Sequence, residues 1–449
     1  MRLFRFAKVM AAFLLGVLLV QLVSACSAGP QAEGKTRLTI ATVNNGDMVV
    51  MQDLSSRFEA NNPDIELNWV VLEENILRQR TTTDVASQGG QFDVLTIGSY
   101  EAPIWARRGW LRSLEGLPAD YDVDDLLDPI RTGLSYDDQL YAVPFYGESS
   151  MLYYRTDLFE QAGITVPQSP TYEQVGQWAE QVNDPDNDVY GICLRGKPGW
   201  GENMAFLTTM VNTFGGRWFD MDWNPTLDTP EWQNAVSFYV DILNQYGPPG
   251  ASSNGFNENL ALFSTGKCGM WIDATVAAGL LSNPEQSQVA DRVGFAAAPV
   301  ASYPNGSNWL WAWSLAIPET SQSPEAAERF IAWATSKEYI QLVAEENGWV
   351  AVPPGTRVST YENPNYQAAA PFAATVLNSI QSADITNPSP EPTPYKGVQY
   401  VDIPEFQAIG TQVGQRMAAA LAGNASVEQT LSRSQTVAER FMRHTGYIE

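Results

Sequence analysis

Three short polar segments, each placed directly after an apolar run, contain the residues with the clearest capacity for chemistry in this 449-residue chain. Carboxylates accept hydrogen bonds and asparagine both donates and accepts them, so such segments can bind a neutral hydroxylated ligand. Two carboxylates ~5–9.5 Å apart can also cleave a glycosidic bond, which makes a glycoside hydrolase an alternative. The segments are Asn44-Asn45 after 37–43, Glu73-Glu74-Asn75 after 65–72, and Tyr100-Glu101 after 92–97.

Composition removes several other classes of function. The single histidine, His444, lies near the C-terminus, which argues against histidine-based triads, proton shuttles and metal sites. Three cysteines are too few for a cysteine zinc site, so we expect no metal and no cofactor. The formal net charge of −25 repels phosphate backbones, so we expect no nucleic-acid partner.

The elements that position these segments alternate between strand and helix. Such alternation predicts a parallel sheet covered by helices, with ligands at the carboxyl ends of the strands. A second α/β unit is expected to begin near residue 151. The expected strands are 37–43, 65–72, 92–97, 151–155, 190–194, 269–273 and 309–317, and the expected helices are 48–61, 76–88, 157–162, 171–182, 203–214, 231–244, 324–334 and 338–345.

The first residues have the pattern of a targeting segment. Three basic residues precede an apolar run at 9–20, which is short for a membrane span, and small residues lead to Cys26. Val-Ser-Ala-Cys resembles the bacterial lipobox, so 1–25 is predicted to be a lipoprotein signal peptide and Cys26 the lipidated residue. An ordinary signal peptide with a chance cysteine is the alternative. Residues 26–36 would form a flexible tether, and the chain would be exported and lipid-anchored, on the periplasmic or the cell-surface side.

The two remaining cysteines are Cys193 and Cys268. Because an exported compartment is oxidising, we expect them to form a disulfide. Two buried free thiols are the alternative.

Five short motifs spread along the chain carry a family resemblance: RFEANNP at 57–63, FDV at 92–94, AVP at 142–144, YRTDLF at 154–159 and FSTGK at 263–267. Together they resemble the extracellular solute-binding proteins of ABC importers, family 1. Longer strings are similar to the sorbitol/mannitol-type polyol-binding branch of that family. They are ATVNNGDMVVMQDL, NWVVLEENILRQR, GGQFDVLTIGSYE, YGESSMLYYRTDLFE, GICLRGKPGWGEN, PPGASSNGFNENLALF, GMWIDATVAA and NWLWAWSLAIP.

The resemblance implies an α/β, two-lobed periplasmic-binding-protein fold of type II-like topology, with a ligand cleft between the lobes. It implies a first lobe of 37–146 plus about 309–352 and a second of 147–308 plus about 353–449. The ligand would be a sugar alcohol, delivered to an inner-membrane permease with its ATPase by a monomeric binding protein that is not an enzyme. The ligand-binding residues it implies are Asn44, Asn45, Glu74, Glu101, Tyr146, Glu148, Arg195, Trp200, Asn203, Trp271, Asp273, Trp309 and Trp311.

These residue types suit a polyol, because carboxylates, amides and a guanidinium pair with hydroxyls while indole faces pack on C–H groups. Structural roles remain open for several of them. Glu74 can begin a helix, Glu101 can cap one, Tyr146 can be a packed hinge residue, and Trp271 can be core. Arg195 can pair with Glu202, and Trp313, on the same strand face as Trp309 and Trp311, is expected to pack.

Three other interpretations stay open at this point. A cyclic sugar or oligosaccharide would keep the importer role with a different ligand. An exported glycoside hydrolase would use two of the same carboxylates for catalysis. An adhesin or structural lipoprotein would leave the cleft-side polar residues without a purpose.

Overall fold

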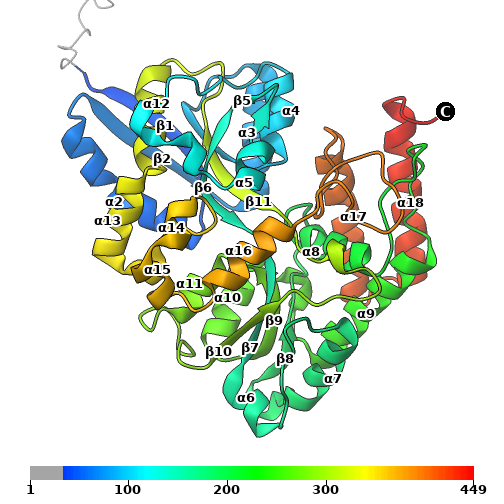
Figure 1. Ribbon diagram of the computed structural model, residues 1–449. Coiled ribbons are helices and arrows are strands. Elements are labelled where there is room, and N and C mark those ends of the chain that lie inside the picture. Colours follow the sequence, from blue (N-terminus) through cyan, green and yellow to red (C-terminus); the bar gives the residue numbers. More distant parts are fainter. Residues whose placement is uncertain (1–33) are drawn as a thin grey trace, which may run out of the picture.

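The computed structural model describes residues 34–449, so the predicted signal peptide, Cys26 and most of the tether lie outside the described residues. The described chain forms two α/β units, each around its own sheet (Figure 1). The two-lobed α/β fold expected from the sequence is thereby confirmed. None of the helices within 34–449 has the length and apolar character needed to cross a membrane.

The first sheet has five strands in the order β2-β1-β3-β11-β6. Parallel pairing joins β1 (Thr36–Val43) to β2 (Ile65–Leu72) and to β3 (Val94–Ile97). The antiparallel strand β11 (Trp311–Ala316) lies between β3 and β6 (Ala142–Glu148). The other elements of this unit are α2 (Gly46–Asn61), α3 (Glu74–Ser87), α4 (Glu101–Arg107), α5 (Asp128–Gly133), the hairpin β4 (Ser135–Tyr136) with β5 (Gln139–Leu140), α12 (Pro324–Ala334) and α13 (Lys337–Asn347).

The second sheet has four strands in the order β10-β7-β9-β8. The predicted disulfide is present and links Cys193 in β8 to Cys268 in β9, with their Cα atoms 5.9 Å apart. Its strands are β7 (Ser150–Arg155), β8 (Tyr190–Cys193), β9 (Cys268–Ala274) and β10 (Val293–Ala297), and its helices are α6 (Thr156–Gln161), α7 (Tyr172–Val182), α8 (Asn203–Thr213), α9 (Pro230–Tyr246), α10 (Phe256–Ser264) and α11 (Ala277–Ser282).

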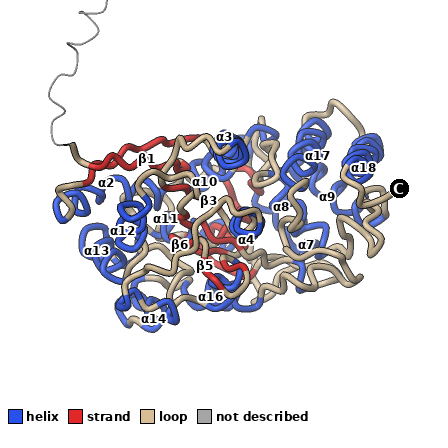
Figure 2. Tube along the Cα trace, turned by 90° about the horizontal axis from the view of Figure 1, so that it is seen from above, coloured by secondary structure: helices blue, strands red, loops and turns tan. Residues whose placement is uncertain are grey.

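The C-terminal residues add five helices on the second unit and at the junction of the two. Helix α16 contacts β6, β7 and β10, and α17 and α18 pack against α8 and α9 (Figure 2). Buried residues of α18 recur at three- and four-residue spacing, such as Leu431, Ser434, Ala438 and Met442, which gives this helix one face toward its neighbours. The helices are α14 (Val358–Glu362), α15 (Pro364–Ala369), α16 (Ala373–Ser382), α17 (Phe406–Leu421) and α18 (Val427–His444).

The chain passes between the two sheets more than once. Only Ser149 separates β6, in the first sheet, from β7, in the second. The chain returns through the segment between β10 and β11. This segment delays the start of β11 to Trp311, two residues later than expected, because the Trp309 and Leu310 N–H groups face Ser150 Oγ and Gln399 Oε1. Strand pairing therefore begins only once the chain has entered the first sheet.

Candidate ligand-binding site

The polar segments identified in the sequence lie at one edge of the first sheet. Asn45 follows β1, Glu74 is the first residue of α3 after β2, and Glu101 is the first residue of α4 after β3. Because these three strands run parallel, their carboxyl ends open on the same side, toward the second unit. The position of the segments follows directly from the strand–helix alternation.

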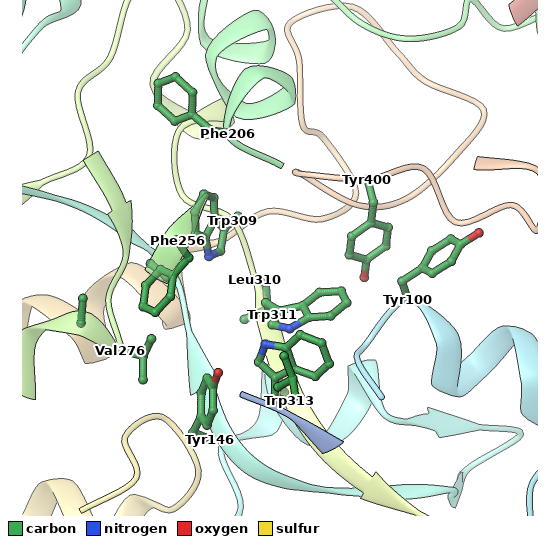
Figure 3. Close-up of a cluster of buried hydrophobic side chains, with 14 of the residues drawn as sticks. Tyr100, Tyr146, Phe206, Phe256, Val276, Trp309, Leu310, Trp311, Trp313 and Tyr400 are labelled. Atoms are coloured by element: carbon green, nitrogen blue, oxygen red, sulfur yellow. The ribbon is translucent and has the colours of Figure 1, made fainter. Parts of the chain in front are cut away.

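A cavity lies where this edge meets the second unit. It has about 470 Å³ of empty volume, counted with the part that opens to solvent. Trp309, Trp311, Trp313, Tyr146 and Phe256 gather around it (Figure 3). The full set of lining residues is Asn45, Glu74, Arg78, Tyr146, Glu148, Arg195, Trp200, Gly201, Ala205, Phe256, Ala274, Val276, Trp309, Trp311, Trp313 and Gln399.

Arg78, one turn into α3, is the basic group of the first unit in this cavity. Its Nη1 donates to Glu101 Oε1 at 2.6 Å, and its Nε donates to Glu74 Oε1 at 3.0 Å. The guanidinium carbon lies 4.2 Å from the ring centre of Trp200 and 4.7 Å from that of Trp313. Burial lowers the pKa of Arg78, but the two carboxylates raise it by more, so its net pKa is above the ordinary value. Arg78 is thus a fixed, fully charged donor.

Arg195 is the matching group of the second unit. Its Nη2 donates to Asp273 Oδ1 at 2.6 Å and its Nε to Asp273 Oδ2 at 2.9 Å, while Nη1 donates to the Gly201 carbonyl at 2.9 Å. Trp271 Nε1 also donates to Asp273 Oδ2, at 3.0 Å. The guanidinium carbon lies 5.7 Å from the ring centre of Trp309. Each unit therefore supplies one arginine that a carboxylate orients and an indole flanks.

Three groups that line the cavity have no partner among the described residues. The indole N–H groups of Trp200 and Trp309 are buried without an acceptor. The Glu148 carboxylate makes no hydrogen bond or ion pair within residues 34–449, although the residue is only 6% exposed. Burial raises the pKa of Glu148 well above its ordinary value, with Arg195 opposing the shift and Asp273 adding to it. These groups are free to bind a ligand.

The two units touch on both sides of the cavity, so the structure represents a closed state. Lys197 Nζ lies 2.8 Å from Glu73 Oε1, and Asn257 Nδ2 donates to the Asn44 carbonyl at 3.3 Å. Tyr100 OH donates to the Ile403 carbonyl at 2.8 Å. A ligand inside would be covered by residues from both units.

Asp47, in the first turn of α2, is a further buried carboxylate at this junction. It lines a neighbouring cavity with Leu280 of α11 and Tyr366 of α15. Burial, partly offset by a backbone hydrogen bond, raises the pKa of Asp47 to about 7. Within residues 34–449, no cluster of three or more histidine, cysteine or acidic side chains is arranged to hold a metal ion.

The structure separates the thirteen proposed ligand residues into two groups. Eight line the cavity, and five lie outside its lining. Of those five, Glu101 and Asp273 hold the two arginines, Trp271 is fully buried against Tyr153, and Asn203 donates to the Gly414 carbonyl at 2.8 Å. The eight are Asn45, Glu74, Tyr146, Glu148, Arg195, Trp200, Trp309 and Trp311, and the fifth outside residue is Asn44, at the adjoining groove.

Four polar or aromatic lining residues were not among those candidates: Arg78, Phe256, Trp313 and Gln399. Arg78 lies in a charged helix segment, where a solvent-facing position is the ordinary expectation. Trp313 was expected to pack, yet it lines the cavity beside Trp311, with the ring centres 5.6 Å apart. Gln399 comes from a segment without helix or strand, and its amide donates to the Leu310 carbonyl at 2.8 Å. The only available signal was for Trp313, which shares the strand face of the other two tryptophans.

Comparison with known proteins adds independent findings. A family model described as bacterial extracellular solute-binding protein matches residues 44–341. The chain is 56% identical over 427 residues to the mannitol-binding protein of Pseudomonas aeruginosa, covering 95% of this chain and 98% of that protein. The crystal structure of an ABC transporter solute-binding protein from Agrobacterium vitis with bound D-mannitol has a TM-score of 0.91 at 60% identity, covering 92% of this chain and 100% of the other. A ribitol complex from Agrobacterium radiobacter gives 0.80 at 26% identity, covering 91% and 99%.

Proposed function

Because this chain belongs to the bacterial extracellular solute-binding protein family, we propose that it captures an acyclic sugar alcohol and delivers it to an ABC importer. The ligand class is that of mannitol, sorbitol and arabitol. The receiving partner is an inner-membrane permease with its ATPase. The names of the Pseudomonas protein and of the two polyol complexes support this assignment.

One observation carries the proposal: the cavity between the lobes holds unpartnered donors and an acceptor around flat aromatic walls. Trp200 and Trp309 each offer an indole N–H, and Glu148 offers a carboxylate. A polyol has a hydroxyl on every carbon and can satisfy donors and acceptors together, while its C–H groups pack on the rings. A hydrogen bond to a charged group contributes roughly 1.5–3 kcal/mol, so a few suffice for micromolar binding at about −8 kcal/mol.

The proposed roles of the site residues follow from their positions. Direct contacts come from the eight lining candidates together with Arg78 and Trp313. Glu101 and Asp273 orient the arginines, Trp271 supports Asp273, and Asn203 and Asn44 act through the loops that they hold. The residues around the cavity therefore act as two arginine-centred halves, one for each lobe.

We assign the first lobe to 37–146 plus about 309–352 and the second to 147–308 plus about 353–449. Opening and closing would bend the chain near Tyr146, three residues before the crossing at Ser149, and near Asn308, in the segment that returns to the first sheet. The ligand favours closure only by the contacts that it gains in the closed state. The protein would act as a monomer held to the membrane by lipid on Cys26, with 26–36 as tether.

Calorimetric titration of the chain from Ser27 to Glu449 tests this function. The panel is D-mannitol, D-sorbitol, D-arabitol, glucose and maltose. We expect binding of the alditols in the micromolar range or tighter and none of the two cyclic sugars. Binding of glucose or maltose alone would overturn the ligand assignment, and binding of no compound would overturn the role as a polyol-binding protein. Release of phenol from aryl-glycosides would support the hydrolase instead.

A further inference from the structure

The carboxyl groups around the cavity outnumber its basic groups. Arg78 is paired with two carboxylates, those of Glu74 and Glu101. Arg195 is paired with Asp273 and also lies 3.9 Å from Glu202 Oε2. Both arginines are therefore already neutralised by protein groups. Glu148 remains, with its side chain on the cavity and no basic side chain within ion-pair distance among the described residues.

Lys197, the next basic group near the cavity, does not supply a cation for Glu148. Lys197 lies at the rim and contacts Glu73 at 2.8 Å and Glu202 at 3.5 Å, so two further carboxylates accompany it. Asp47, near the same junction, is a second acid without a cation. The buried surroundings of the cavity therefore hold more carboxyl groups than basic groups, and burial raises the pKa of Glu148, Glu202 and Asp47.

With a neutral alditol, Glu148 has no cation beside it and its carboxyl favours the protonated form, whereas a cationic alditol supplies the missing counter-charge. An alkylammonium is charged at neutral pH, like a lysine side chain, and it is about the size of the hydroxyl that it replaces. An ammonium beside a buried carboxylate forms a charge-assisted hydrogen bond that is about twice as strong as a neutral one. Burial of the ammonium opposes this gain, but the carboxylate is buried already, before any ligand arrives.

We propose that the cavity also binds amino derivatives of sugar alcohols, in which an ammonium replaces one hydroxyl and pairs with Glu148. This inference rests on the proposed function, because the remaining hydroxyls would use the contacts assigned to a polyol. The same excess of carboxylates excludes sugar acids, whose carboxylate would meet Glu148 and Glu74 without a free cation. The raised pKa of Glu148 agrees with this assignment, since a ligand cation would restore its charged form.

The first test compares matched ligands on the chain from Ser27 to Glu449. Calorimetry at neutral pH measures the dissociation constants of D-mannitol, its 1-amino-1-deoxy and 2-amino-2-deoxy derivatives, and D-mannonate. We expect at least one amine to bind within about tenfold of D-mannitol, and mannonate to bind at least about a hundredfold more weakly. If both amines bind more than about tenfold more weakly than D-mannitol, or if mannonate binds as well as they do, the inference is wrong while the proposed function stands. Failure of D-mannitol itself would refute the proposed function.

The second test assigns the effect to one side chain. Glu148→Gln keeps the shape of the side chain and removes its charge, and the readout is the ratio of the amine and D-mannitol dissociation constants. We expect Glu148→Gln to shift this ratio against the amine by at least about fivefold, whatever happens to D-mannitol binding. Glu173→Gln, at an exposed residue in the first turn of α7, is the matched control and should leave the ratio unchanged. If Glu148→Gln shifts the ratio of the two dissociation constants by less than about fivefold, Glu148 is excluded as the partner of the ammonium.

Discussion

Gly201 permits a close approach of the two lobes beside the cavity, and replacing it by alanine should weaken ligand binding. A Cβ atom at this position would lie 2.3 Å from Glu74 Oε1 and 3.1 Å from Arg78 Nε, both across the cleft. Gly201 is not among the glycines with positive φ, so alanine fits its backbone conformation when the lobes are apart. The substitution therefore acts against the closed state.

The expected loss of affinity follows from the atoms that a Cβ at position 201 would displace. To reach ordinary contact, the Glu74 carboxylate has to withdraw by about 1 Å, away from the hydrogen bond that it accepts from Arg78 Nε at 3.0 Å. A hydrogen bond to a charged group is worth roughly 1.5–3 kcal/mol. Because about 1.4 kcal/mol corresponds to a factor of ten, the dissociation constant should rise roughly 10- to 150-fold.

Calorimetric titration with D-mannitol measures this change, and differential scanning calorimetry of the unliganded chain measures its stability. Gly133→Ala, at the end of α5, is the matched control, because its Cβ would have no neighbour closer than 3.7 Å. We expect Gly201→Ala to keep the unliganded melting temperature of the control. An affinity within about threefold of the unchanged chain, or an equal loss in both variants, would refute this account of closure.

Three further predictions concern the interior. Asp273→Asn should weaken binding by more than about tenfold and destabilise the fold by about 3–5 kcal/mol, because Arg195 is then buried without its bidentate partner. Calorimetric titration measures the loss of affinity and urea titration measures the loss of stability. Unchanged affinity would contradict the role of Asp273. Reduction of the Cys193–Cys268 disulfide, which spans 75 residues, should lower the free energy of unfolding by about 4 kcal/mol in the chain-entropy model. The melting temperature should fall when reductant is added, whereas that of a Cys193→Ser, Cys268→Ser double variant should not change with reductant. Burial raises the pKa of Asp47 to about 7 from 3.8, so the folded chain holds a proton that the unfolded chain releases, and the unfolding free energy should fall as pH rises from about 4 to about 7. Asp47→Asn should reduce that slope in urea titrations, and an equal slope in both proteins would count against the burial of this carboxylate.

The sequence predicts β1, β2, β3 and the edge of the site, because these depend on local patterns, but it does not predict β6, β10 or the helices α14 to α18. Apolar runs of five to eight residues between helical stretches define β1 and β2, and residues following parallel strands share one edge of the sheet. Asn45 and Glu74 could therefore be placed near each other although 28 residues separate them in the chain.

The missing part of the site depends on contacts between distant segments. Trp200, Trp311 and Trp313 cover the guanidinium of Arg78, and the sequence of its own helix does not predict these contacts. Likewise, Trp271 has the residue type of a ligand contact, but its stacking on Tyr153 turns it into the core. Local pattern identifies which residues can do chemistry, whereas tertiary packing decides which of them reach the cavity.

The position of β11 has a consequence for biogenesis. This strand lies between β3 and β6 in the first sheet, yet it comes from residues 311–316, after all four strands of the second sheet have been made. Until residue 316 emerges, β3 and β6 each lack a neighbour, and the N-terminal third of the chain cannot complete its hydrogen bonds. Completion of the first sheet must therefore wait until the strands of the second sheet have been synthesised. A nascent chain with this connectivity stays without its final tertiary structure for most of its synthesis, which suits a polypeptide that is threaded across a membrane before it folds.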